Sequence, residues 1–375
     1  MANGKGRIVR EPIRALRDEQ TGARVLQLTD DPSINHHLYF LTPSLTPDES
    51  TLVFASYRTG RCEYFKRPFP EGDTVQITDE EDIHGYSGLI TPETPSLLYT
   101  AGGAVRSVDL ETLESRTLAH YEGGQLGECS LSADRRWIVT AIKRGGRSGL
   151  AVTATDGASA EVVLEIERTI IHPQFHPTDP DRIAYSQDPA PRMWWVHRDG
   201  SGNECLYEHG SDEFLVHETF LGDGASLIVV RWPYALLRFD LAARRFHTIA
   251  AFNAWHIGGS RDGRTVLCDT AHPDTGLQIV DVATGSHRTI CHPCSSNGGS
   301  QWLKDRYALP EDWAAAAAEK SKALSWMEMK ADTVYGPQWT HPHPSFSPSE
   351  RWVLYTSDVS GSPQVYAAEL GESPG

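Results

Sequence analysis

The sequence predicts an all-β fold, a seven-bladed β-propeller closed into a ring by an N-terminal strand. One short unit recurs along the chain: small or proline residues, a turn rich in Pro, Asp and Gly, then a strand of aromatic and β-branched residues. Its seven copies have turns at Thr46, Thr91, Ser132, His176, Leu221, Ser260 and Ser347. The first five spacings are 45, 41, 44, 45 and 39 residues, and propeller blades repeat at about 40 to 45 residues.

The two ends of the repeat array predict how the ring closes. Weaker strands follow each copy, which indicates four strands per blade. The seventh copy is followed only by SPQVYAAEL, so its blade lacks one strand, and we expect residues 23–30 (ARVLQLTD) to supply it. Closure of this kind removes exposed sheet edges.

An insertion is predicted before the last blade. The final spacing of 87 residues leaves room for extra chain at about residues 291–339, and EDWAAAAAEKSKALSWMEM within it has the composition of a helix. We interpret residues 1–375 as a single propeller domain that carries this helical insertion.

Composition narrows the class of partner. The chain of 375 residues has 34 Lys and Arg against 50 Asp and Glu, a net charge of -16. The basic residues are scattered, so we expect neither nucleic acid nor a membrane surface as a partner. The six cysteines are thinly spread, which is typical of reduced thiols in a cytoplasmic protein. Cys291 and Cys294 form a CxxC pair without a second pair, and we interpret them as free thiols in a loop. The oligomeric state leaves no signature in the sequence.

Histidines recur at one position of the repeat. The residues four before each turn are Thr42, Ser87, Glu128, His172, His217, His256 and His343. Four of these seven are histidines in a chain that has 16. Equivalent positions in the blades lie at one height around the axis, so the pattern predicts a ring of imidazoles at one mouth of the channel.

Arginines are expected at the same mouth. The strand after each turn returns to the histidine side, which brings Arg58, Arg144, Arg192 and Arg231 to loops there. A local cationic rim on an acidic protein predicts a small anionic ligand. We expect His172, Arg58 and Arg231 to contribute to binding it.

A metal centre is predicted beside this ring. His256 and His343 belong to neighbouring blades, and Gln338 and His341 lie five and two residues before His343. Three imidazole nitrogens and one amide oxygen suit Mn, Fe, Co, Ni or Zn better than Ca, which prefers more oxygen ligands. Without a carboxylate ligand the metal keeps its full charge, so an anionic ligand can complete its coordination, as in catalytic sites.

An ordered set of motifs carries a family resemblance. They are QxxHPHPSFSP (338–348), HPQFHPTDPD (172–181), PRMWWVHRDGSG (191–202), VHETF (216–220) and WHIGGSRDG (255–263). Together they resemble the oligogalacturonate lyase family over most of the chain. The resemblance implies a cytoplasmic seven-bladed propeller that cleaves short galacturonates by β-elimination in pectin degradation, with a metal, usually manganese, held by three His and one Gln.

The resemblance also implies roles for individual residues. The metal ligands would be His256, Gln338, His341 and His343. His217 stands at the position of the histidine that abstracts the proton next to the uronate carboxylate, and Arg192 matches a nearby arginine. A histidine can act as a base near neutral pH, and an always-protonated arginine can stabilise the charge that develops. The implied partner is a small anionic oligosaccharide.

Three alternatives stay open at this stage. The same site would serve a lyase acting on another uronate-containing oligosaccharide. A TolB-like propeller that binds a partner without catalysis has the same architecture. Glycoside hydrolysis needs a carboxylate pair, for which only Glu128 and Glu218 lie near the histidine ring.

Overall fold

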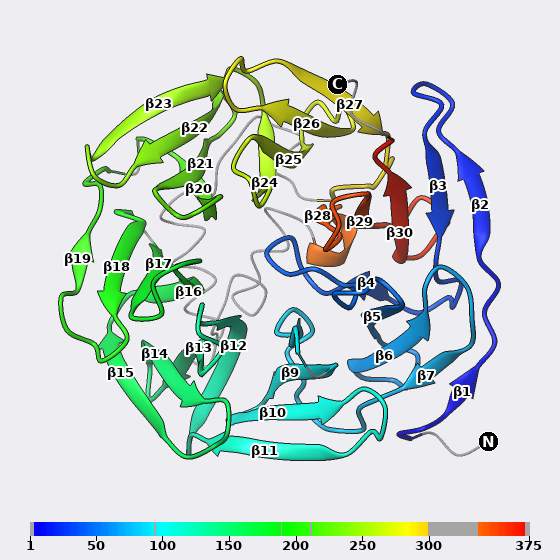
Figure 1. Cartoon of the computed structure of the whole chain (residues 1–375), viewed down its shortest axis with the longest axis horizontal. Helices are drawn as coiled ribbons and strands as arrows, with labels where there is room; N and C mark the ends of the chain where they lie inside the picture. Colours follow the sequence, from blue (N-terminus) through cyan, green and yellow to red (C-terminus); the bar gives the residue numbers. More distant parts are fainter. Residues whose placement is uncertain (1–3, 94, 189, 211, 299–336, 372–375) are drawn as a thin grey trace.

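Seven antiparallel sheets surround a central axis in the computed structural model, which describes residues 4–93, 95–188, 190–210, 212–298 and 337–371 (Figure 1). The predicted all-β seven-bladed propeller is therefore confirmed. Within these residues the helical element is one 3-10 turn, η1 (Gln338–Thr340). The helix predicted within residues 291–339 falls on 299–336, outside the described residues.

Blades 1 to 3 follow one another along the chain. Blade 1 holds β4 (Asn35–His37), β5 (Thr51–Ser56), β6 (Glu63–Pro68) and β7 (Thr74–Gln76), with β1 (Ile8–Val9) at its outer edge. Blade 2 holds β8 (Leu89–Ile90), β9 (Ser96–Ala101), β10 (Ala104–Asp109) and β11 (Ser115–His120). Blade 3 holds β12 (Gly124–Leu131), β13 (Trp137–Arg144), β14 (Arg147–Ala154) and β15 (Ala160–Ile166).

Blades 4 to 7 complete the ring. Blade 4 holds β16 (Thr169–Phe175), β17 (Arg182–Asp188), β18 (Met193–His197) and β19 (Glu204–Cys205). Blade 5 holds β20 (Leu215–Leu221), β21 (Ser226–Arg231), β22 (Ala235–Asp240) and β23 (Arg245–Ala250). Blade 6 holds β24 (Ala254–Gly259), β25 (Thr265–Thr270), β26 (Leu277–Asp281) and β27 (His287–Cys291). Blade 7 holds β28 (Ser345–Phe346), β29 (Trp352–Ser357) and β30 (Gln364–Glu369), with β2 (Arg14–Arg17) and β3 (Arg24–Gln27).

The N-terminal segment joins two blades. Strand β3 pairs antiparallel with β30, and it lies within the residues for which the sequence predicts a role in closing the ring. Strand β2 pairs with β3, and β1 pairs with β7 of blade 1. Blades 1 and 7 therefore have five strands each rather than the expected four. Because strand side chains alternate, Val25 packs with blade 6 and Leu26 packs with blade 1.

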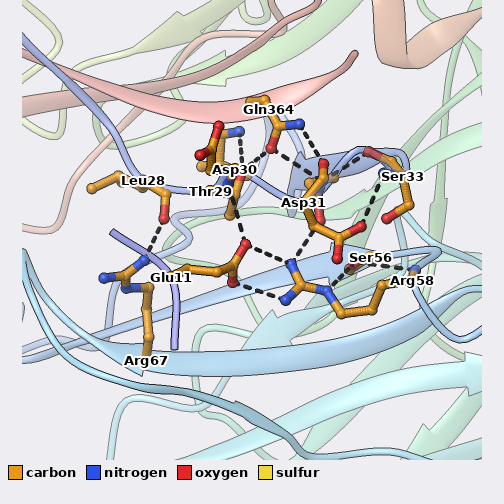
Figure 2. Close-up of polar contacts among 12 residues, drawn as sticks. Glu11, Leu28, Thr29, Asp30, Asp31, Ser33, Ser56, Arg58, Arg67 and Gln364 are labelled. Carbon is orange, nitrogen blue, oxygen red and sulfur yellow. Dashed lines mark hydrogen bonds and ion pairs between the residues drawn. The ribbon is translucent and has the colours of Figure 1, made fainter. Parts of the chain in front are cut away.

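A cluster of polar side chains, which we call the closure cluster, ties the two ends of the ring together (Figure 2). The Glu11 carboxylate accepts from both terminal nitrogens of Arg58, at 2.8 and 3.1 Å. Arg58 also donates to Asn35 Oδ1 at 2.9 Å, and the Asn35 amide donates to Gln364 Oε1 at 3.1 Å. Thr29 donates to the same Gln364 oxygen at 2.7 Å. These bonds connect the N-terminal segment with the first residues of β4 and β30.

Irregularities of the innermost strands aim side chains at the channel. The pairing register shifts in β12, β16, β20 and β24, around Glu128, His172, His217 and His256 respectively. His172 and His217 have positive φ angles of 50° and 57°, which β-branched residues would strongly disfavour. Such bulges turn side chains out of the regular alternation and are common beside active sites. The recurrence of these residues four positions before each turn thus reflects one repeated bulge.

Candidate metal centre and active site

Three buried histidines meet at the junction of blades 6 and 7. His256 comes from β24, whereas His341 and His343 lie between η1 and β28. One ligand-type nitrogen of each lies within 4.8 Å of those of the other two. The His256 and His343 ring centroids are 3.8 Å apart, and His343 Nε2 is buried without a partner. Three converging imidazoles, one of them with an unpartnered nitrogen, are a donor set that fits a transition-metal ion.

Asp269 of β25 holds two of these histidines. Its Oδ2 accepts from His256 Nδ1 at 2.7 Å, and its Oδ1 accepts from the His256 backbone N–H at 2.7 Å. Oδ2 also accepts from the His343 backbone N–H at 3.2 Å. A histidine that donates from Nδ1 keeps the Nε2 lone pair available for a metal.

The remaining channel histidines continue the row. The His217 ring centroid lies 4.5 Å from that of His256, and the His172 centroid lies 6.3 Å from that of His217. His172 Nδ1 and His217 Nδ1 are buried without a hydrogen-bond partner. The structure therefore brings together the histidines that the repeat position predicted in blades 4 to 7.

A hairpin of blade 1 closes the channel behind these rings. The Phe40 ring lies 5.4 to 5.9 Å, centroid to centroid, from the rings of His172, His217, His256 and His343. The Tyr39 hydroxyl is 2.9 Å from His172 Nε2. We call Tyr39 and Phe40 the aromatic floor of the site. The repeat pattern did not predict these contacts, because the two residues follow the short strand β4.

Burial keeps the channel histidines neutral. Burial lowers the pKa of His217 well below its ordinary value, and the neighbouring His256 and His172 lower it further. Burial likewise lowers the pKa of His172, although the charge of Glu128 opposes this shift. A neutral imidazole has a free lone pair and can accept a proton.

Arg192 is held by two buried carboxylates. Its Nε donates to Glu218 Oε1 at 2.9 Å, and its Nη1 donates to Asp188. Burial alone would lower the pKa of Arg192, but Asp188 and Glu218 raise it, so the guanidinium stays charged. Burial alone would raise the pKa of Glu218, whereas Arg192 lowers it to about 2. The guanidinium next to the channel is therefore fixed in position and already paired.

The other expected arginines also have acidic partners. Arg58 belongs to the closure cluster and is paired with Glu11, both with little exposed side chain. Arg144 pairs with Glu165 at 3.0 Å. Arg231 lies 3.8 Å from Glu213 with 42% of its side chain exposed. The expected rim of arginines is thus neutralised locally by carboxylates that the sequence spacing did not reveal.

Two cavities lie around the hairpin that carries the aromatic floor. One, of about 310 Å³, is bounded by Tyr39, Glu128 and His172. The other, of about 380 Å³, is bounded by Phe40, Arg261 and residues of the turn after β28. Glu128 Oε2 is buried without a partner, and Glu128 is one of the residues that line the smaller cavity.

Comparison with known proteins finds similarity to oligogalacturonate lyases. A family model described as oligogalacturonate lyase matches residues 1–136. The oligogalacturonide lyase of Pectobacterium atrosepticum is 24% identical, and the match covers 98% of this chain and 99% of that protein. The oligogalacturonate lyase of Dickeya dadantii is 23% identical with the same coverage.

The predicted resemblance to the oligogalacturonate lyase family is confirmed by these matches. The full-length relatives and the family model support an enzyme of the lyase class. Solved structures share the fold of this family. An oligogalacturonate lyase in complex with manganese has a TM-score of 0.81 at 21% identity, covering 99% of both chains. The Vibrio parahaemolyticus oligogalacturonate lyase has a TM-score of 0.80 at 21% identity, covering 98% of this chain and 99% of that one.

Among the described residues, no helix is long and apolar enough to cross a membrane.

Sequence reasoning missed one residue of the candidate site, Asp269. It lies in a strand segment, VLCDT, that carries no motif. An acidic residue among the apolar residues of a buried strand is the signal by which it could have been found.

Proposed function

We propose that the protein is a metal-dependent lyase that cleaves short oligogalacturonides by β-elimination to 4,5-unsaturated uronate products. One observation carries this proposal: the buried cluster of His256, His341 and His343 lies next to His217, a neutral imidazole with an unpartnered nitrogen. A cation site beside a base is the arrangement that proton abstraction next to a carboxylate requires. The family supports the reaction class.

The metal site proposed here consists of His256, His341 and His343, with Gln338 as the fourth ligand. Gln338 begins η1, and its carbonyl oxygen accepts from the His341 backbone N–H at 3.1 Å, which ties the two residues together. Manganese is the proposed metal, since a solved relative is a manganese complex. When bound, the ion would withdraw charge from a uronate carboxylate and so acidify the neighbouring C–H.

His217 is proposed as the base. Its buried imidazole is neutral, so it can take the C5 proton of the sugar. The electrons of that C–H bond form the C4=C5 double bond, and the C4 oxygen leaves with its electron pair and is protonated. The aromatic floor formed by Phe40 excludes water below the imidazole.

Arg192 is proposed as the charge stabiliser. Its guanidinium stays ionised between Glu218 and Asp188, which fixes it in one orientation before substrate binds. His172 is proposed to contact the sugar, because its Nδ1 is unpartnered in the channel. Arg231 has an exposed side chain suited to an outer substrate contact. Arg58 as a substrate contact stays a prediction, and its bonds within the closure cluster favour a structural role instead.

The proposed substrate enters from the cytoplasm as an imported fragment, and neither nucleic acid nor membrane is involved. The test is digalacturonate with manganese, followed by ultraviolet absorbance and product mass, with a glucuronate disaccharide in parallel. Elimination gives a double bond conjugated to the carboxylate, so absorbance rises and no water is incorporated. Products heavier by one water without an absorbance change would mean hydrolysis. If only the glucuronate disaccharide is cleaved, the elimination mechanism stands, but the substrate is a glucuronate rather than a galacturonate.

A further inference from the structure

Asp269 makes its contacts to the proposed metal ligands rather than to a basic side chain. Its hydrogen-bond partners are His256 Nδ1, the His256 backbone N–H and the His343 backbone N–H. The residue is 2% exposed. We propose that Asp269 is a positioning residue that sets the affinity of the centre for its metal. This inference rests on the metal site of the proposed function.

The first part of its role is to fix the tautomer of His256. Both oxygens of Asp269 already accept from backbone N–H groups, so we assign the proton of the third contact to the His256 Nδ1 atom, which lies 2.7 Å from Oδ2. With the proton on Nδ1, the Nε2 lone pair is available to a metal ion. Without this acceptor, a neutral imidazole can carry its proton on either nitrogen. When the proton is on Nε2, that nitrogen has no lone pair for a metal ion.

The second part is to set the spacing between ligands from two blades. Asp269 and His256 belong to blade 6, whereas His343 precedes the first strand of blade 7. One carboxylate bonds to the backbone of both histidines, and their rings stand 3.8 Å apart, centroid to centroid. Asp269 therefore links His256 to His343 across the boundary between the two blades, and both histidines must bind the same ion.

His343 is also held from its other side. His37 Nε2 lies 2.6 Å from the His343 carbonyl oxygen and must donate to it, while His37 Nδ1 accepts from the Thr356 hydroxyl at 2.8 Å. His343 has a positive φ of 48°, a conformation that persists only where the surroundings enforce it. The Asp269 and His37 bonds together supply that enforcement.

Direct ligation by Asp269 does not fit these contacts. Both carboxylate oxygens already accept short bonds from N–H donors, and the residues whose nitrogens converge are the three histidines. A carboxylate that ligated the ion would have to give up the bonds that orient His256 and His343. The effect of Asp269 on the metal is therefore exerted through the histidines.

The test compares Asp269→Asn with Asp274→Asn in the full-length chain. Asp274 lies in the loop after the same strand. It accepts from the Gly276 backbone N–H at 2.8 Å and from the Thr270 hydroxyl at 3.4 Å, and neither donor belongs to a ligand histidine. Affinity for Mn²⁺ and for Zn²⁺ is measured by competition with a chromophoric chelator, and Tm is measured after metal removal. We expect Asp269→Asn to bind both ions about 10 to 100-fold more weakly, with a metal-free Tm close to that of the control variant. Asp274→Asn should bind metal as the wild type does.

Other outcomes separate the possibilities. Equal metal affinity of Asp269→Asn and wild type would overturn the positioning role. A wild-type protein without metal affinity would overturn the metal centre itself, which is a different failure. If Asp269→Asn does not fold, Asp269→Glu keeps the charge and displaces it by one methylene. Weakened metal binding at an unchanged metal-free Tm supports the role there, and unchanged binding rejects it. Side-chain ¹⁵N spectra of the metal-free protein give a separate readout, because His256 should be protonated at Nδ1 in wild type and lose that preference in Asp269→Asn.

Discussion

The channel histidines and the closure cluster are both buried and polar, but they differ in how their atoms are satisfied. In the closure cluster, Arg58 and Glu11 bond to each other through both terminal nitrogens and both oxygens (Figure 2). In the channel, by contrast, His172 Nδ1, His217 Nδ1 and His343 Nε2 have no partner. Burying an unpaired polar group costs stability. The difference indicates that the closure cluster stabilises the fold, whereas the unpartnered nitrogens of the channel histidines are available to bind a ligand.

The largest expected effect is the loss of metal binding when channel histidines are replaced. Replacing His341 and His343 together with Ala removes two of the three converging imidazoles, so metal binding should be lost. Elemental analysis of the purified variant measures the metal content. Wild-type stoichiometry in the double variant would contradict the ligand assignment.

The next effect separates chemistry from metal binding. His217→Ala should keep metal and fold, because His217 lies beside the cluster without being one of its members. Turnover should fall by about two to four orders of magnitude, the usual range for loss of a general base. Turnover is measured on digalacturonate at saturating metal. Near-normal turnover would move the role to His172.

A variant of the closure cluster tests whether this cluster stabilises the fold. Arg58→Ala leaves the buried Glu11 carboxylate without its cation, although the Asp30 backbone N–H still donates to it at 3.2 Å, so the free energy of unfolding should fall by about 3–5 kcal/mol. Urea unfolding measures it, with Arg144→Ala as the control, since the exposed Arg144–Glu165 pair should contribute only about 0–1 kcal/mol. A raised KM at unchanged stability would instead assign Arg58 to substrate binding.

The smallest expected effect concerns acid stability. The pKa of Glu218 is lowered to about 2 in the folded chain because Arg192 offsets the effect of burial. A lowered folded-state pKa stabilises the protein above the unfolded pKa of about 4.3, and this contribution disappears as the pH falls toward 2. Unfolding experiments between pH 6 and pH 3 should therefore show a shallower loss of stability in Glu218→Gln than in wild type. Parallel pH curves for the two proteins would contradict this linkage.

The sequence by itself determined the repeat. The spacing of the turns predicts the blades, because each blade is a local unit whose strands pair with their sequence neighbours. The recurring position four residues before each turn singled out His172, His217, His256 and His343, whose rings lie next to one another in the structure. The interpretation of residues 1–375 as one domain stays a prediction.

Only the tertiary structure decided which groups are paired. Asp269 meets His343 across 74 residues of sequence, and Glu11 meets Arg58 across 47. Arg58 therefore bonds within the ring closure, although its position after a strand had predicted a place at the substrate rim. The physical reason is that a repeat fixes the height and direction of a side chain, whereas its hydrogen-bond partner depends on contacts between blades, for which strand periodicity carries no signal.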